Sequence, residues 1–141
     1  MASGSNPPAI QAHICVKGAS DAIAFYEKAF GAVCTIKHMT DDGKRVMHTN
    51  LEMFGGEVMM HDEFPEFGNY VLAPSNLGGA SMTIHINRPQ PAEVDVIVAR
   101  AEGAGATVIL EPQDVFWGTR YAKVRDPFGH VWAFNAPLKS P

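Results

Sequence analysis

Histidine is the residue type that most clearly marks a candidate site in this chain of 141 residues, which contains six histidines. His13 and His85 each lie inside a short apolar run that is typical of a β-strand. Two others, His48 and His61, fall in further strand-like runs. Imidazoles can hydrogen-bond a ligand, transfer protons near neutral pH or coordinate a metal ion. We expect these four side chains to line a ligand pocket.

A second group of candidate residues combines aromatic rings with a cation. Trp117, Arg120 and Tyr121 lie at the entrance of a predicted strand, where they could form an aromatic wall and a positive charge for an anionic or aromatic ligand. The alternative is that Trp117 packs in the core and Arg120 forms a salt bridge. Asp62 and Glu63 are the one tandem carboxylate pair near a predicted strand end, and a general-base role for them is the weaker hypothesis.

The elements that must position these residues occur twice along the chain. In the first half, a strand at 12–16 precedes a helix for which we expect Ser20 to be the N-cap. Gly31 can end that helix, and a strand at 32–36 follows.

The second half has the same order of elements. A strand at 82–86 precedes a helix at 92–102, Gly105 can end that helix, and a strand at 106–110 follows. Corresponding residues are 72 apart at the first strand and 74 apart at the glycine stop. Two extra residues in the Pro89–Pro91 loop account for this difference, so the order predicts an internal repeat.

Each half continues into a hairpin. In the first half we expect Gly55-Gly56 to form the turn, and in the second half Asp126-Pro127-Phe128-Gly129. The hairpin strands are predicted at 45–53, 57–61, 121–125 and 130–134. Each half is therefore β-α-β-β-β, and the fold class is α+β.

The predicted domain organisation follows from this repeat. We expect residues 1–8 to be a flexible N-terminal arm and residues 9–141 to form a single domain. Within it, the first module spans about 9–63, a linker or lid spans 64–79, and the second module spans about 80–137.

Composition limits the partners of the chain. The net charge is −4 and the basic residues are scattered, which argues against nucleic acid as a partner. No apolar run approaches the roughly 20 residues needed to cross a bilayer, so no membrane partner is expected. The two cysteines, Cys15 and Cys34, have no CxxC spacing and are expected to be reduced thiols in the cytoplasm.

Several strings in this order resemble the vicinal oxygen chelate superfamily, also called the glyoxalase/bleomycin resistance/dioxygenase superfamily, and within it the PhnB-like branch. The resemblance covers about residues 9–136. The strings are Val16 to Tyr26 followed by Phe30-Gly31-Ala32, Met47-His48, Asp62-Glu63-Phe64, Phe116 to Tyr121, and Arg125 to Trp132. It implies two tandem modules whose curved, mixed sheets form a cup, with a ligand inside the cup and a homodimer as the assembled form.

Metal-using members of the superfamily bind a divalent ion with four side chains, typically His or Gln, Glu, His and Glu. Alignment with that pattern puts the first position at Gln11 and the third at Thr83. The second falls at Met59 or Met60 and the fourth at Ala133. Three of the four cannot hold a hard cation, so no standard metal site and no cofactor are expected.

The alternative is that His13, His61 and His85 form a metal site at a position displaced from the standard one. Two functions therefore remain open. The first is a small-molecule-binding protein that holds an aromatic or amphipathic ligand in the cup, with Gln11, Thr83 and the histidines among its pocket residues. The second is a glyoxalase/isomerase- or lyase-type enzyme that uses a shifted histidine-rich metal site or histidine acid–base chemistry.

Overall fold

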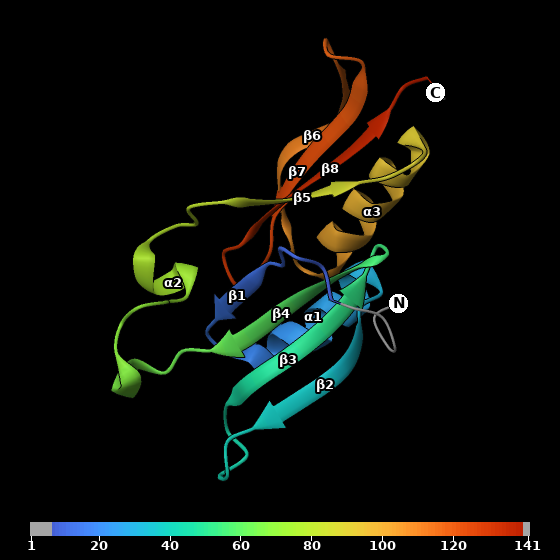
Figure 1. Ribbon diagram of the computed structural model, residues 1–141. Coiled ribbons are helices and arrows are strands. Elements are labelled where there is room, and N and C mark those ends of the chain that lie inside the picture. The colour runs from blue at the N-terminus through green and yellow to red at the C-terminus, as the bar shows by residue number, and fades with distance from the viewer. Residues whose placement is uncertain (1–6, 140–141) are drawn as a thin grey trace. The chain divides into compact units, whose positions relative to one another are not determined.

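The computed structural model describes residues 7–139, so most of the predicted N-terminal arm at 1–8 lies outside the described residues. The chain divides into two compact units, residues 1–79 and 80–141. Each unit contains a helix and a four-stranded mixed sheet in the predicted order β-α-β-β-β (Figure 1). The predicted fold class is thereby confirmed. Among the described residues, no helix is long and apolar enough to cross a membrane.

The first unit is a sheet with one long helix packed against it. Its strands lie in the order β1-β4-β3-β2, and only the β1–β4 pair of this sheet is parallel. Helix α1 contacts all four strands. The elements are β1 (His13–Val16), α1 (Ala19–Phe30), β2 (Val33–Met39), β3 (Val46–Met53), β4 (Gly56–Asp62), the 3-10 helix η1 (Pro65–Phe67) and α2 (Pro74–Leu77).

The core of this unit lies between α1 and one face of the sheet. Tyr26 of α1 is fully buried, as are Val16, Leu51 and Met60 of the strands. Because side chains along a strand alternate between its two faces, their neighbours point to the face opposite α1. We call this opposite side the helix-free face of the first sheet.

Helix α1 begins at Ala19, so the prediction that Ser20 is its N-cap is wrong. The residue before the helix is Gly18, whose φ of 93° favours glycine and which has no side chain for capping. The capping acceptor comes from the end of β4 instead. Asp62 Oδ1 accepts hydrogen bonds from the backbone N–H groups of Gly18 and Ala19 at 2.9 and 2.8 Å. A carboxylate distant in the sequence therefore satisfies backbone N–H groups at the start of this helix.

The same carboxylate also holds the start of β3. Asp62 Oδ2 accepts a hydrogen bond from the Val46 N–H at 2.7 Å. The Asp62 side chain is 5% exposed, so all three of its bonds lie in a mostly buried environment. The carboxylate thus ties the β1–α1 junction, β3 and β4 together on the helix side of the sheet.

The turn between β3 and β4 differs from the predicted Gly55-Gly56 pair. Phe54 and Gly55 form it, with φ values of 55° and 77°, and Met53 pairs with Gly56. Positive φ at both central residues is the geometry that suits a two-residue hairpin. This register places Met60 on the buried side and Met59 on the helix-free face.

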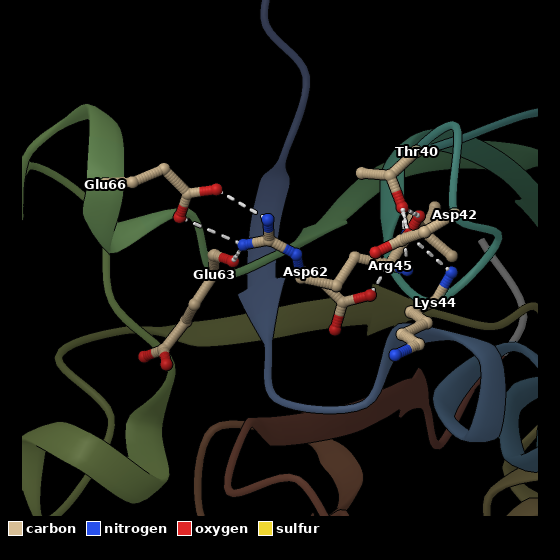
Figure 2. Close-up of polar contacts among 8 residues, drawn as sticks. Thr40, Asp42, Lys44, Arg45, Asp62, Glu63 and Glu66 are labelled. Atoms are coloured by element: carbon tan, nitrogen blue, oxygen red, sulfur yellow. Dashed lines mark hydrogen bonds and ion pairs between the residues drawn. The ribbon is translucent and has the colours of Figure 1, made fainter.

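The segment after β4 is attached to the first unit by two acidic side chains. The Glu63 carboxylate accepts hydrogen bonds from the Ala73 N–H at 2.7 Å and from the Asn76 amide. Figure 2 shows the Arg45 guanidinium between Glu63 and Glu66. It donates to the Glu63 carbonyl at 3.1 Å and to the Glu66 carboxylate at 3.0 Å. Residues 64–79 therefore belong structurally with the first unit.

The second unit repeats the architecture. Its strands lie in the order β5-β8-β7-β6, and only the β5–β8 pair of this sheet is parallel. The elements are β5 (Thr83–Asn87), α3 (Pro91–Ala104), β6 (Thr107–Val115), β7 (Thr119–Arg125) and β8 (Val131–Pro137). Helix α3 contacts β6, β7 and β8. The face opposite α3 is the helix-free face of the second sheet.

Local interactions fix the ends of elements in this unit. Helix α3 has its own capping box, formed by Gln90 and Glu93. The Asp126 carboxylate closes the β7–β8 turn by accepting hydrogen bonds from the N–H groups of Phe128 and His130 at 2.8 and 3.0 Å. It also accepts one from the buried indole N–H of Trp132 at 2.8 Å.

Replacing Asp62 by alanine should destabilise the protein strongly, because three backbone donors lose their acceptor in a buried place. We expect Asp62→Ala to lower the free energy of unfolding by about 2–4 kcal/mol, measured by urea denaturation. Asp21→Ala, which removes a carboxylate from the first turn of the same helix, is the control and should cost less than about 1 kcal/mol. Equal losses in the two variants would contradict the role of Asp62.

Candidate functional site

Three of the predicted site histidines meet on the helix-free face of the first sheet. His13 of β1, His48 of β3 and His61 of β4 come from three strands, and we call them the histidine cluster. The ring centroid of His13 is 5.4 Å from that of His48 and 5.0 Å from that of His61. Both contacts are edge-to-face, with interplanar angles of 84° and 89°. The register of the strands therefore brings these three side chains next to one another.

Hydrogen bonds to oxygen atoms orient two of the rings. His61 Nδ1 lies 2.6 Å from the backbone carbonyl oxygen of Asp62, and His48 Nε2 lies 2.5 Å from Asn50 Oδ1. Carbonyl and amide oxygens only accept hydrogen bonds, so these two ring nitrogens carry the proton. In its neutral form each ring then keeps a lone pair on its other nitrogen, Nε2 of His61 and Nδ1 of His48.

The environment of His13 favours its neutral form. Burial lowers the pKa of His13 below its usual value of 6.5, and the neighbouring His61 and His48 lower it further. Desolvation and a nearby like charge both penalise a cationic imidazole. His13 is consequently an uncharged imidazole at pH 7.

Gln11 and Met59 occupy the first two positions of the metal-ligand pattern in this unit. Gln11 Nε2 donates a hydrogen bond to Glu57 Oε1 at 2.7 Å, so its amide is paired with a carboxylate. Met59 pairs with His13 across β1 and β4 and offers a thioether. A thioether is a soft ligand and does not suit a hard divalent cation. Met59 therefore does not fit the metal that the superfamily pattern implies, whereas the Gln11 amide oxygen is a chemically acceptable ligand.

The helix-free face of the second sheet brings together an aromatic and polar group centred on Tyr121. The Tyr121 ring centroid lies 5.7 Å from that of Trp117 and 6.3 Å from that of His85. Lys123 Nζ lies 5.8 Å from the Tyr121 ring centroid. His85 Nε2 also lies 3.0 Å from Asn87 Oδ1. We call these five side chains the tyrosine cluster.

Trp117 is 53% exposed, so it does not pack in the core, which was the alternative to a ligand-facing role. Its indole lies against Tyr121 with an interplanar angle of 73°. A large apolar ring that stays exposed beside a tyrosine and a lysine can contact an aromatic ligand.

Thr83 and Ala133 hold the remaining two positions of the metal-ligand pattern. Ala133 pairs with His85 on one side and Lys123 on the other, and its methyl group is fully buried. A methyl group cannot coordinate a cation. As in the first unit, these side chains do not fit the metal of the superfamily pattern.

Arg120 does not join the predicted pocket. Its guanidinium forms ion pairs with Asp95 of α3 at 2.7 Å and with Asp114 of β6 at 2.9 Å. The contact with α3 places it on the helix side of the sheet, whereas Tyr121 points to the other side because neighbours in a strand alternate. Arg120 therefore has the structural role that the sequence offered as the alternative.

Metal binding by the histidines was the other alternative. His13 and His61 lie together in the first unit, whereas His85 belongs to the second unit. Within residues 7–139, no group of three or more His, Cys, Asp or Glu side chains is arranged to hold a metal ion.

Some members of these faces were missed in the sequence. Asn50 and Asn87 each bond a histidine two residues earlier, so His-x-Asn occurs once in each unit. That spacing was a visible signal, because residues two apart in a strand share a face. Glu57 and Lys123 had no comparable signal, and only the strand register shows that they belong to these faces.

The match to known proteins is consistent with this architecture. The sequence profile of the Glyoxalase/Bleomycin resistance protein/Dioxygenase superfamily matches residues 9–134. The chain belongs to this superfamily. An uncharacterized protein of Mycobacterium bovis is 41% identical over 133 residues, which cover 94% of this chain and 85% of the relative.

Solved structures share the superfamily fold. The product of an Arabidopsis thaliana gene is 26% identical with a TM-score of 0.69, and the match covers 90% of this chain and 97% of that one. The PhnB protein from Bacillus cereus is 16% identical with a TM-score of 0.69, and the match covers 92% of this chain and 99% of that one. The resemblance to the superfamily is thus confirmed by the sequence profile, and the PhnB protein shares its fold.

The neighbours of His13 give a direct prediction for its titration. In an NMR pH titration, the His13 ring should take up its proton below pH 6.5, because burial and two imidazoles disfavour the cation. His61→Ala removes one of these imidazoles and should raise the pKa of His13. A pKa of His13 above 6.5, or no change in the variant, would contradict the described surroundings.

Proposed function

We propose that this chain is a small-molecule-binding member of its superfamily, which binds an aromatic or amphipathic ligand without a metal ion. The observation that carries the proposal is the tyrosine cluster, where an exposed indole, a phenol and an imidazole lie beside the Lys123 ammonium. Apolar rings supply binding energy through burial, and a few polar groups orient the ligand.

The free energy gained by burying apolar surface favours a ligand that is planar and largely apolar. An aromatic ring that buries about 150 Å² of apolar surface gains roughly 4 kcal/mol before the cost of association. A positive charge over the face of a ring adds about 0.5–1 kcal/mol at an exposed place. Lys123 therefore favours a ligand that carries an acidic group next to its rings.

The residues at the superfamily's ligand positions support the metal-free part of the proposal. Gln11 is paired with Glu57, and Met59 and Ala133 provide no hard oxygen or imidazole ligand. Binding through burial and hydrogen bonds needs none of these groups.

An isomerase- or lyase-type enzyme is the second candidate function. The lowered pKa of His13 favours it, because a neutral imidazole beside two other imidazoles can accept a proton from a substrate at pH 7. The first proposal is preferred, because the tyrosine cluster has the composition of a binding surface.

We further propose that the protein is a homodimer in the cytoplasm. Cys15 and Cys34 are not joined in a disulfide, which is consistent with a reducing compartment. Two apolar side chains of the edge strand β2, Val33 and Ile36, are 57% and 43% exposed. Exposed apolar side chains on an edge strand are suited to contact with a second copy.

The binding proposal can be tested with 1-anilinonaphthalene-8-sulfonate, a fluorescent aromatic anion. We expect saturable binding that quenches tryptophan emission, and Trp117→Phe should remove most of the quenching, because Trp132 is fully buried. Lys123→Met should weaken binding about fivefold.

The control is Tyr70→Ala, which removes an aromatic ring that is 89% exposed in the other unit. It should leave the affinity for the anion unchanged. Binding that is equally weakened by the control, or that is lost after treatment with a metal chelator, would contradict metal-free binding at the tyrosine cluster.

The dimer is tested by light scattering at micromolar concentration. We expect twice the mass of one 15.2 kDa chain. Ile36→Lys places a charge among the exposed apolar side chains of β2 and should shift the population toward monomer. A wild-type protein that is monomeric at this concentration would refute the proposal.

A further inference from the structure

The helix-free face of the first sheet differs in charge from the tyrosine cluster. Among the described residues of β1 to β4 that point to this face, none is lysine or arginine. Its polar groups are imidazoles, an asparagine and the carboxylates of Glu52 and Glu57, and Glu57 is bonded to Gln11. A face with acceptors and a carboxylate but without a cation is suited to a positively charged ligand.

The histidine cluster presents lone pairs. His61 donates its Nδ1 proton to the Asp62 carbonyl, and His48 donates its Nε2 proton to Asn50. The nitrogens that remain, Nε2 of His61 and Nδ1 of His48, are acceptors when the rings are neutral. These groups match the N–H donors of an ammonium ion.

Apolar surface lies directly beside these acceptors. Met59 is on the same face, paired with His13 on one side and with Asn50 on the other. A flexible thioether packs well against aromatic rings. A ligand with a planar apolar part and a charged amine could therefore contact both kinds of surface at once.

We propose that the histidine cluster binds the N–H groups of an amphipathic organic cation. The imidazole lone pairs accept hydrogen bonds from its N–H groups. Met59 contacts its apolar part, and the Glu57 carboxylate attracts its positive charge. This inference rests on the proposed function in that both concern a small organic ligand, but it assigns a different face and the opposite ligand charge.

Binding should depend on pH, because protonated imidazoles repel a cation. His13 remains neutral at pH 7, since its pKa lies below 6.5. As the pH falls through the lowered pKa of His13, this ring gains a charge, and the affinity for a cation falls.

Other titratable groups face or border the same surface. Cys15 is neutral across this range, because burial raises the pKa of its thiol to about 11. The Glu63 carboxylate is bonded to Ala73 and Asn76 at the end of β4. The remaining ones on this face of the strands are His38, Glu52 and Glu57.

The test uses proflavine, a planar acridine that is a cation at both pH 5.5 and pH 7.5, with full-length protein in the presence of EDTA. Fluorescence titration should show binding at pH 7.5 that weakens at least about threefold when the pH is lowered to 5.5, because charge gained at His13 repels the cation. His61→Lys places a permanent charge in the cluster and should weaken binding by about tenfold or more, which corresponds to 1.4 kcal/mol.

His130→Gln, which changes a histidine in the β7–β8 turn, is the matched control and should leave proflavine binding unchanged. Circular dichroism checks that each variant is folded. If His61→Lys does not fold, His13→Gln and His48→Gln provide the same test and should each weaken binding at least about twofold.

Proflavine binding that is unaffected by all three cluster variants, or that strengthens at pH 5.5, would overturn the inference. The anilinonaphthalene anion distinguishes this outcome from failure of the proposed function. If the anion binds at Trp117 and proflavine does not bind the histidine cluster, the proposed function stands and the cation site is wrong. If the anion does not bind but proflavine still binds in a way that depends on the histidine cluster, the cation site stands and the proposed function is wrong.

Discussion

The buried carboxylate of Asp62 is the interaction on which the arrangement of the first unit depends. It accepts backbone hydrogen bonds from Gly18, Ala19 and Val46, and these bonds hold its side chain on the helix side of β4. Because neighbouring residues in a strand point to opposite faces, the same bonds require His61 to point to the helix-free face. The contacts that cap α1 therefore also position one member of the histidine cluster.

The two units reach the same topology with different local chemistry. In the register of the second sheet, Ala136 of β8 occupies the place that Asp62 has in β4. Helix α3 has its own capping box at Gln90 and Glu93, so it needs no carboxylate from the sheet. The helix-free faces of the two sheets differ as well. Lys123 lies beside the Tyr121 ring in the second unit, whereas Glu57 lies on the same face as the imidazoles in the first. A duplicated fold thus presents two surfaces that carry different charged side chains.

The order of elements was predictable, because hydrophobic runs and glycine stops repeat along the chain. The neighbourhood of His13, His48 and His61 was predictable in part, since strand alternation places residues on faces. The turn at Phe54-Gly55 was not predictable, because a phenylalanine with positive φ has no signal in the sequence. The role of Asp62 was missed for a similar reason: its partners lie far away in the chain, and local patterns favoured Ser20. Arg120 was assigned to the pocket, but its side chain lies on the helix side of the sheet. Its ion pair with Asp95 of α3 could not be read from the sequence.

The hydrogen-bonded orientation of the rings in the histidine cluster is the central claim, and the ring tautomers test it most directly. Nitrogen NMR of the imidazole rings at pH 7.5 reads which ring nitrogen carries the proton. The predicted result is a proton on Nδ1 of His61 and on Nε2 of His48, as their hydrogen bonds to Asp62 and Asn50 require. A reversed tautomer in both rings would contradict it.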